Sequence, residues 1–245
     1  MHERVIGVMG GMGPEATVEL MRRVIAATPA EDDTDHIRMI VDNNPKVPSR
    51  IKALVEGGGE DPGPALAAMA SGLQAAGAEV LVIACNTAHH YLPVIEAAVD
   101  IPVLDVVALT ADRLSASPAP HRRIGMLASP AVRLVRLFDR RFRERDLAAL
   151  YPAESDQAAL LDLIRDVKAG RVADAGLAAY EDVARRLVAQ QGVDALLVAC
   201  TELSTLAKPR VGVPVIDTLE IIVDAVIAAA RPPVEPAGAV STRLP

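Results

Sequence analysis

Two cysteines, Cys85 and Cys200, are the residues of this chain whose type and placement best suit a chemical role. Each closes a short apolar run and precedes small polar residues and a stretch of helical periodicity. In open α/β sheets, ligands bind beyond the carboxyl ends of the strands, where the N-terminus of a helix favours a thiolate over a thiol. A lone cysteine at a strand end is more often a small buried hydrophobe. The case for a chemical role therefore depends on the presence of two cysteines in similar positions.

The sequence around the two cysteines is duplicated. Three segments recur in the same order, at offsets of 115, 112 and 118 residues, which indicates an internal repeat. The matching pairs are GAEVLVIACNT (77–87) and GVDALLVACTE (192–202), IPVLDV (101–106) and VPVIDT (213–218), and RVIGVMG (4–10) and RRIGMLA (122–128). We therefore expect two similar halves related by a pseudo-twofold axis, with one thiol in each.

Two thiols related in this way suit the transfer of a proton across a carbon atom. In a racemisation one group removes the proton from one face of the carbon, and a protonated partner returns a proton to the opposite face. Positioned proton transfer contributes roughly 10² to 10⁴ in rate, so fixed donors and exclusion of water must supply the rest. Asn86, Thr87 and Thr201 follow the cysteines and could hold an α-carboxylate, although helix capping explains them about equally well.

Short β-branched runs alternate with longer helical stretches, which predicts an α/β protein with parallel strands. Strands are expected at 5–10, 37–43, 80–85, 102–106, 124–128, 195–200 and 214–217, with a further one near 147–152. Helices are expected near 14–27, 62–76, 87–99, 107–116, 130–143, 156–168, 173–191 and 218–230. The expected domains are a first half (1–105 plus 212–230), a second half (106–211) and a loosely held, Pro-rich tail (231–245).

A Gly-rich turn between the first strand and the first helix offers an anion site. The segment GVMGGMGPEAT (7–17) lets the backbone approach a ligand, and the start of a helix attracts negative charge. Residues 11–16 also fit the pattern G-x-G-x-x-A, with Asp42 placed to bind a ribose. A dinucleotide-binding oxidoreductase is therefore a competing interpretation.

Three charged residues could take part in binding. Arg50 lies in a Pro/Asn-rich loop, and its guanidinium suits a second carboxylate, although a solvated surface arginine is the ordinary alternative. Lys168 stands at an expected helix end, where it could be either a dipole partner or another cation for that carboxylate. Glu202 could raise or lower the proton affinity of Cys200, depending on its own charge.

Composition excludes several classes of function. The 245 residues are 51% hydrophobic and 23% charged, as in an ordinary globular protein. A net charge of −7 and 2% aromatic residues argue against a nucleic-acid partner. The N-terminus does not look like a signal peptide, and the apolar run IIVDAVIAAA is too short to span a bilayer, so we expect a cytoplasmic protein without membrane contact. The spacing of His89 and His90 predicts no metal site.

Six further motifs stand out along the chain: GGMGPEAT (10–17), NNPKVPSR (43–50), GEDPGPAL (59–66), ACNTAH (84–89), VKAG (167–170) and ACTEL (199–203). Their order is that of aspartate racemases of the pyridoxal-phosphate-independent aspartate/glutamate racemase superfamily, which the chain resembles from residue 4 to about residue 230. The resemblance implies two α/β halves with the active site in the cleft between them, no cofactor, no metal and a homodimer. The residues it implies are catalytic Cys85 and Cys200, a side-chain carboxylate site of Arg50 and Lys168, and further substrate contacts from Met12, Gly13, Asn44, Asn86, Thr87, Thr201 and Glu202.

Ser49 departs from the family pattern, because the loop often carries Asp before the arginine that stands here as Arg50. This difference bears on substrate choice more than on the type of reaction. We therefore expect a cofactor-independent racemase that interconverts L- and D-aspartate, or glutamate, by a two-cysteine, two-base proton transfer. The alternatives are a thiol-dependent diacid isomerase or decarboxylase of the same superfamily, the dinucleotide-binding oxidoreductase, and a binding protein that has kept the cleft without turnover.

Overall fold

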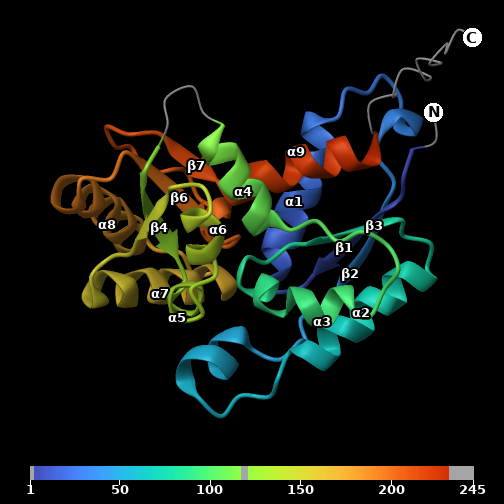
Figure 1. The fold of residues 1–245 in the computed structure, drawn as a ribbon, viewed down its shortest axis with the longest axis horizontal. Helices are drawn as coiled ribbons and strands as arrows, with labels where there is room; N and C mark the ends of the chain where they lie inside the picture. Colours follow the sequence, from blue (N-terminus) through green and yellow to red (C-terminus); the bar gives the residue numbers. More distant parts are fainter. Residues whose placement is uncertain (1–2, 117–120, 232–245) are drawn as a thin grey trace, which may run out of the picture.

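Two separate, wholly parallel sheets form the framework of the molecule (Figure 1). The structure is a computed structural model, and it describes residues 3–116 and 121–231. The first sheet has the strand order β2-β1-β3 and the second has the order β5-β4-β6-β7. The strands are β1 Ile6–Gly10, β2 Met39–Asn43, β3 Val80–Ile83, β4 Arg123–Ala128, β5 Ala148–Leu150, β6 Ala195–Ala199 and β7 Val215–Asp217. The expected fold class, two α/β halves with parallel sheets, is confirmed.

The register of the two sheets follows the duplication residue by residue. Ile6 of β1 pairs with Val80 of β3, and the equivalent residues Ile124 and Ala195 pair in the second sheet. At the next position Leu81 forms an isolated parallel bridge to Val103, where its counterpart Leu196 pairs with Val215 in a regular strand. The expected strand at 102–106 is therefore reduced to a single bridge. The repeat seen in the sequence is a repeat of backbone geometry.

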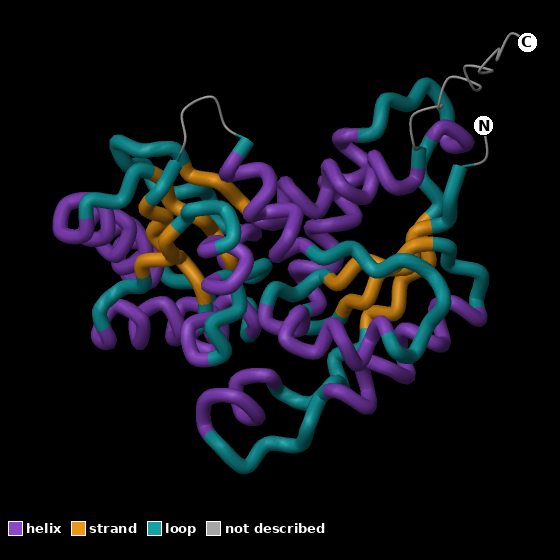
Figure 2. The backbone as a smooth tube through the Cα atoms, viewed as in Figure 1, coloured by secondary structure: helices purple, strands orange, loops and turns teal. Residues whose placement is uncertain are grey.

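Helices surround both sheets, and three of them, α1, α4 and α9, lie between the sheets (Figures 1 and 2). The α-helices are α1 Pro14–Ala27, α2 Gly63–Ala75, α3 Leu92–Glu96, α4 Val106–Ser115, α5 Pro130–Leu134, α6 Asp139–Arg143, α7 Glu154–Lys168, α8 Asp174–Gln191 and α9 Thr218–Ala230. Short 3-10 turns are η1 Asp33–Asp35, η3 Thr87–Tyr91 and η4 Leu203–Thr205, and η2 Lys52–Glu56 is a π-helical turn. No helix within the described ranges is long and apolar enough to cross a bilayer.

One hydrophobic cluster joins the two halves. It contains Val8 from β1, Leu20 from α1, Met126 from β4, Leu197 from β6 and Ile222 from α9, all nearly inaccessible to solvent. Each sheet has one further cluster on its outer face. In the first half this cluster lies between the sheet and α2, and in the second half it lies between the sheet and the helices α7 and α8. Burial of apolar surface stabilises the folded state by about 25 cal/mol per Å². Because separating the halves would expose this shared cluster to water, the cluster holds the halves in a fixed arrangement.

Three expectations about the elements need correction. The helix expected at 130–143 is divided into α5 and α6, because Arg136 between them has a left-handed backbone (φ 49°). The helix expected at 87–99 begins as a 3-10 turn before α3. Residues 212–230, expected in the first half, divide between the two: β7 pairs with β6 in the second sheet, whereas α9 packs against α1. The expected tail, 231–245, lies outside the described residues apart from Arg231.

Gly11 is required by its backbone conformation, and Gly72 provides a matched control. Gly11 has φ 85°, and a Cβ there would collide with the backbone of Asn44. Gly72 lies in α2, where a Cβ would meet only open space. We expect Gly11→Ala to lower the free energy of unfolding by more than about 2 kcal/mol and Gly72→Ala to raise it by about 0.5–1 kcal/mol. Urea denaturation measures both changes, and equal effects would contradict this account of the turn.

Candidate active site

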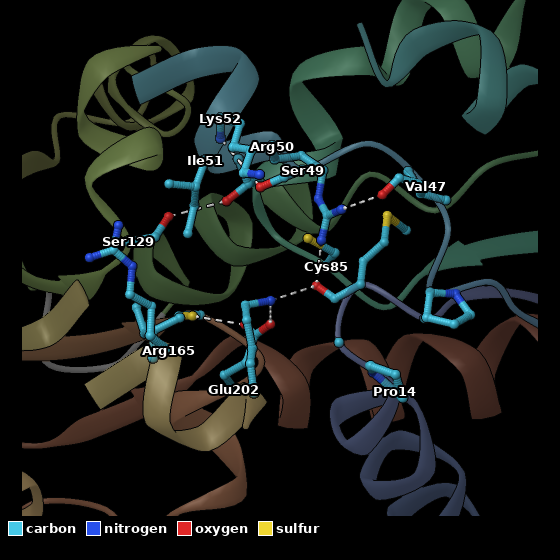
Figure 3. Close-up of a pocket in the computed structure, with 18 of the residues that line it drawn as sticks. Pro14, Val47, Ser49, Arg50, Ile51, Lys52, Cys85, Ser129, Arg165 and Glu202 are labelled. Carbon is cyan, nitrogen blue, oxygen red and sulfur yellow. Dashed lines mark hydrogen bonds and ion pairs between the residues drawn. The ribbon is translucent and has the colours of Figure 1, made fainter. Parts of the chain in front are cut away.

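Both cysteines line one cavity between the halves. Figure 3 shows this cavity with Cys85 and Glu202 on its wall. The cavity has a volume of about 370 Å³, which suits a small ligand. Its wall comes from the segments that follow β1, β2 and β3 in the first half, and from α7 and the loops that follow β4 and β6 in the second. The lining residues are Gly11, Met12, Gly13, Pro14, Pro45, Val47, Ser49, Arg50, Ile51, Lys52, Glu56, Cys85, Thr87, Ser129, Ile164, Arg165, Lys168, Cys200 and Glu202.

The two strands that carry the thiols explain why they meet. Cys200 directly follows β6, and Cys85 comes two residues after the end of β3. Parallel strands bring their carboxyl ends to the same edge of a sheet, and the two sheets contribute those edges to the same cavity. Each thiol is largely buried, with 5% of Cys85 and 6% of Cys200 exposed. The repeat in the sequence predicts this juxtaposition.

Cys200 lies within a chain of polar contacts. Its Sγ donates to Glu202 Oε2 at 3.1 Å, and the other oxygen of Glu202 binds Lys168 Nζ in a short ion pair. Burial raises the pKa of Cys200 well above its ordinary value, and the negative charge of Glu202 raises it further. The expectation that a helix start would favour the thiolate here is wrong, because burial and the carboxylate outweigh the backbone N–H groups. Cys200 is therefore a protonated thiol at neutral pH.

Cys85 has a different environment. The Cys85 carbonyl oxygen lies 3.0 Å from His89 Nδ1, and the backbone N–H of Val106 donates to His89 Nε2 at 3.4 Å. These partners place the histidine proton on Nδ1, and burial lowers the pKa of His89, so the ring is neutral. Thr87 occupies the position equivalent to Glu202, and its Oγ1 lies 3.3 Å from Ser129 Oγ of the second half. Cys85 therefore has hydroxyl groups nearby where Cys200 has a carboxylate.

Arg50 is fixed by backbone carbonyls. Its Nη2 donates to Met12 O at 2.8 Å, and its Nη1 donates to Pro48 O at 3.1 Å and to Val47 O at 3.5 Å. Neutral acceptors leave the charge of the guanidinium uncompensated. Ser49, the departure from the family pattern, accepts with its Oγ from the Lys52 backbone N–H at 3.3 Å.

Lys168 is the last residue of α7, as expected, and it reaches the first half. Besides its ion pair with Glu202, its Nζ donates to Met12 O at 3.4 Å. Gly13 lies beside this pair, because a Cβ there would be 3.3 Å from Glu202 Oε1. The Met12 carbonyl thus receives both Arg50 and Lys168, which links the two predicted cations through one atom. Met12 and Gly13 lie on the cavity wall, as the resemblance implied.

Three predicted contact residues lie outside the set that lines the cavity. Asn86 donates from Nδ2 to Thr218 Oγ1 at 2.9 Å, and its buried Oδ1 has no hydrogen-bond partner. Thr201 Oγ1 donates to Ala84 O at 3.3 Å and so ties the Cys200 turn to the end of β3. Asn44 Oδ1 accepts from the Lys46 backbone N–H at 2.9 Å. Their observed contacts are structural, and a substrate role for them stays a prediction.

The structure adds residues that were not predicted from the sequence. Ser129 is the counterpart of Gly11 at the offset of 118, so the duplication could have revealed it. Ile164 and Arg165 lie on the same face of α7 as Lys168, and helical spacing would have indicated them. Arg165 Nη2 donates to Glu56 Oε1 at 3.0 Å, which joins α7 to η2 across the cavity. No cluster of three or more metal-ligating side chains is found in the described part of the chain.

Comparison with known proteins agrees with this geometry. The sequence model of the family described as Asp/Glu/Hydantoin racemase matches residues 9–226. The aspartate racemase of Picrophilus torridus is 30% identical, with a TM-score of 0.79 over 93% of this chain and 94% of that one. The chain belongs to the Asp/Glu/Hydantoin racemase family. It is an amino-acid racemase, and the dinucleotide interpretation of residues 11–16 is left without support.

More distant relatives have the same fold. Glutamate racemase from Francisella tularensis, solved with D-glutamate, is 19% identical, with a TM-score of 0.64 over 93% of this chain and 81% of that one. The broad specificity amino-acid racemase RacX of Bacillus subtilis is 22% identical over 228 residues, covering 87% of this chain and 92% of its own. These relatives differ in the substrates their names state, so the residues that line the cavity must decide the substrate of this chain.

The carboxylate of Glu202 controls the acidity of Cys200, which a charge-neutral variant can show. In a Cys85→Ser background, we expect Glu202→Gln to lower the pKa of Cys200, because it removes a negative charge and leaves the ammonium of Lys168 unpaired. The pH dependence of alkylation by iodoacetamide measures this pKa. Glu56→Gln, which removes a carboxylate from the same cavity without contact to Cys200, should leave it unchanged. An upward shift in Glu202→Gln would contradict the assignment.

Proposed function

We propose that this racemase interconverts L- and D-aspartate by proton transfer between Cys85 and Cys200, without a cofactor. The observation that carries the proposal is that the two thiols, one from each half, line the same small cavity. A bound α-carbon between them would meet one sulfur on each face. Burial of both thiols supports the proposal further, since exclusion of water strengthens the electrostatic interactions that act on the reacting groups.

The two thiols take opposite roles in each turnover and exchange them between the two enantiomers. For one enantiomer Cys85 acts as the base and Cys200, whose pKa is raised by burial and by Glu202, acts as the acid. The Cys85 thiolate takes the α-proton, the C–H electron pair passes into the α-carboxylate as an enediolate, and Cys200 Sγ delivers its proton to the opposite face. The reaction ends with Cys85 as a thiol and Cys200 as a thiolate. Glu202 then destabilises that thiolate, which favours its reprotonation.

The charge of the cavity favours an acidic amino acid. Among its lining residues are four basic side chains, those of Arg50, Lys52, Arg165 and Lys168, and two acidic ones, those of Glu56 and Glu202. Two of the cations are engaged in ion pairs with the two acids. The remaining positive charge attracts a substrate with two carboxylates and one ammonium group. We assign the side-chain carboxylate to Arg50 and Lys168, whose positions are linked through the Met12 carbonyl.

Hydroxyl groups from both halves suit the α-carboxylate. Thr87 and Ser129 lie within hydrogen-bond distance of each other on the cavity wall, next to Cys85. Donors at this position would stabilise the negative charge that develops on the carboxylate as the α-proton leaves. Asn86 precedes Thr87 in the chain and has a buried Oδ1 without a hydrogen-bond partner, and we assign it to the ammonium group.

A wider range of amino acids is a second candidate. Arg50 already donates to three carbonyl oxygens, which restricts how far it can turn toward a ligand. A substrate without a side-chain carboxylate would then lose less binding free energy than in a site with a freely directed arginine.

Glutamate is the next substrate to test after aspartate. We also expect a homodimer in solution. A thiol-dependent diacid isomerase or decarboxylase of the same superfamily is the alternative if the two thiols do not transfer a proton across an α-carbon.

Loss of either thiol should abolish racemisation. We expect Cys85→Ala and Cys200→Ala each to lower kcat for L- and D-aspartate by at least about 10³-fold, because neither face of the α-carbon can be served by water at a comparable rate. Proton NMR in D₂O measures exchange at the α-carbon, and chiral chromatography measures the enantiomer formed. Thermal melts of both variants show whether the fold is intact. Near-normal rates in both variants would end the two-thiol proposal.

Removal of the cations should affect substrate binding more than turnover. We expect Arg50→Ala and Lys168→Met each to raise KM for aspartate by roughly 10- to 100-fold, since a charge-assisted hydrogen bond is worth about 1.5–3 kcal/mol. Lys46→Ala, in the same loop as Arg50 but exposed and outside the cavity, is the matched control and should leave KM unchanged. If Arg50→Ala and Lys168→Met affect alanine and aspartate equally, neither cation recognises the side-chain carboxylate.

A further inference from the structure

Two crossed ion pairs connect the halves close to the thiols. Arg23 of α1, in the first half, donates from Nη1 to Asp217 Oδ2, at the end of β7 in the second sheet, at 2.8 Å. Arg141 of α6, in the second half, donates from Nη2 to Asp105 Oδ2, beside the first sheet, at 3.3 Å. The arginines are 118 residues apart and the aspartates 112, which are the offsets of the sequence repeat. The duplication has therefore preserved one reciprocal contact between the halves.

The pair formed by Arg23 is the more buried one and does more than join two charges. The side chain of Asp217 is 2% exposed, and its Oδ1 accepts from Ser204 Oγ at 2.6 Å and from the Leu219 backbone N–H at 2.9 Å. Arg23 Nη2 donates to the carbonyl oxygen of Ser204 in a short hydrogen bond. Arg23 thus holds Ser204 twice, directly through its carbonyl and through Asp217.

Ser204 belongs to η4, the turn that carries Cys200. The Ser204 backbone N–H donates to the carbonyl oxygen of Cys200 at 3.0 Å, and the backbone N–H of the neighbouring Leu203 lowers the pKa of Cys200. The position of this turn therefore determines which polar groups lie next to the Cys200 sulfur. Arg23 reaches it from the other half of the molecule.

On the Cys85 side, the equivalent arginine, Arg141, binds Asp105 but makes no hydrogen bond to the turn that follows the cysteine. Position 204 corresponds to His89, whose own imidazole binds the Cys85 carbonyl, and Asp105 accepts from the backbone N–H groups of Val107 and Ala108. Asp105 is 22% exposed in this pair, against 2% for Asp217. An arginine of the other half thus binds the Cys200 turn directly, whereas on the Cys85 side Arg141 reaches Asp105 instead of the turn.

We propose that Arg23 is a positioning residue for Cys200, and that it fixes the turn of the second-half thiol from the first half of the molecule. The effect on turnover rests on the proposed function, whereas the effect on the thiol itself does not. Three charged or titratable groups interact with Cys200: Glu202 on its own turn, Lys168 on α7 and Tyr180 on α8. Asp217 on β7 interacts with the same Tyr180 and accepts from Ser204 of the Cys200 turn. Arg23 therefore acts on this turn both directly and through the charge of Asp217.

The sign of the expected change follows from these contacts. Without Arg23, the buried carboxylate of Asp217 loses its cation, and the released turn no longer fixes the Leu203 N–H that favours the Cys200 thiolate. Both changes disfavour a thiolate at position 200, so the pKa of Cys200 rises further. A defect in packing alone would lower the melting temperature and leave this pKa where it is.

The test is a titration of a single thiol. In a Cys85→Ser background, Arg23→Met should move the midpoint of the pH dependence of iodoacetamide alkylation upward by about one pH unit, a tenfold loss of thiolate at a given pH. Arg113→Met, which breaks an exposed ion pair with Asp224 of α9, is the matched control and should leave the midpoint unchanged. In a Cys200→Ser background, Arg23→Met should leave the alkylation of Cys85 unchanged. A midpoint unchanged by Arg23→Met overturns the proposal, as does an equal shift at Cys85.

Two further variants separate folding from positioning. Arg23→Met/Asp217→Asn removes the unpaired buried charge while the amide oxygen still accepts from Ser204 and Leu219, so its melting temperature should recover and part of the upward shift should remain. Arg23→Lys keeps the ion pair and should show a smaller shift than Arg23→Met. Full recovery of the midpoint in the double variant would mean that Arg23 acts only through charge, and would overturn positioning. Alkylation needs no substrate, so these results stand whether or not aspartate is racemised.

Discussion

The chemistry of this protein depends on two parallel sheets that present their carboxyl ends to one cavity. Every strand of a parallel sheet ends at the same edge, so the loops after β1, β3, β4 and β6 gather wherever the two edges meet. The hydrophobic cluster shared by both halves keeps those edges in place. Cys85 and Cys200 line one cavity because of this arrangement, although neither has a direct contact that draws it toward the other.

Equivalent positions in the two halves have diverged around a common backbone. Thr87 corresponds to Glu202, and His89 corresponds to Ser204, while the strand register around them is the same. The turn after Cys85 therefore carries a hydroxyl group in contact with Ser129, whereas the turn after Cys200 carries a carboxylate that binds both the thiol and an ammonium group. The same backbone thus gives the two thiols different electrostatic surroundings.

Most of the charge inside the cavity is compensated by the protein itself. Lys168 is paired with Glu202, Arg165 is paired with Glu56, and the guanidinium of Arg50 is directed by carbonyl groups of its own loop and of Met12. Fixed charges of this kind cost less reorganisation when a ligand binds than mobile side chains would. The Arg165–Glu56 ion pair and the contact of Lys168 with the Met12 carbonyl cross between the halves, so these charged side chains also help to hold the cavity together.

The sequence by itself determined the parallel α/β class, most strands and helices, and the equivalent positions of the two cysteines. Hydrophobic periodicity and an internal repeat can both be read along the chain without knowledge of tertiary contacts. The positions of Arg50 and Lys168 followed from a family resemblance, and both were placed on the cavity wall. Only the tertiary structure decided that Cys200 is protonated, since its pKa depends on burial and on the orientation of Glu202. It also decided that Arg23 meets Asp217, a contact between residues 194 positions apart that no local pattern specifies.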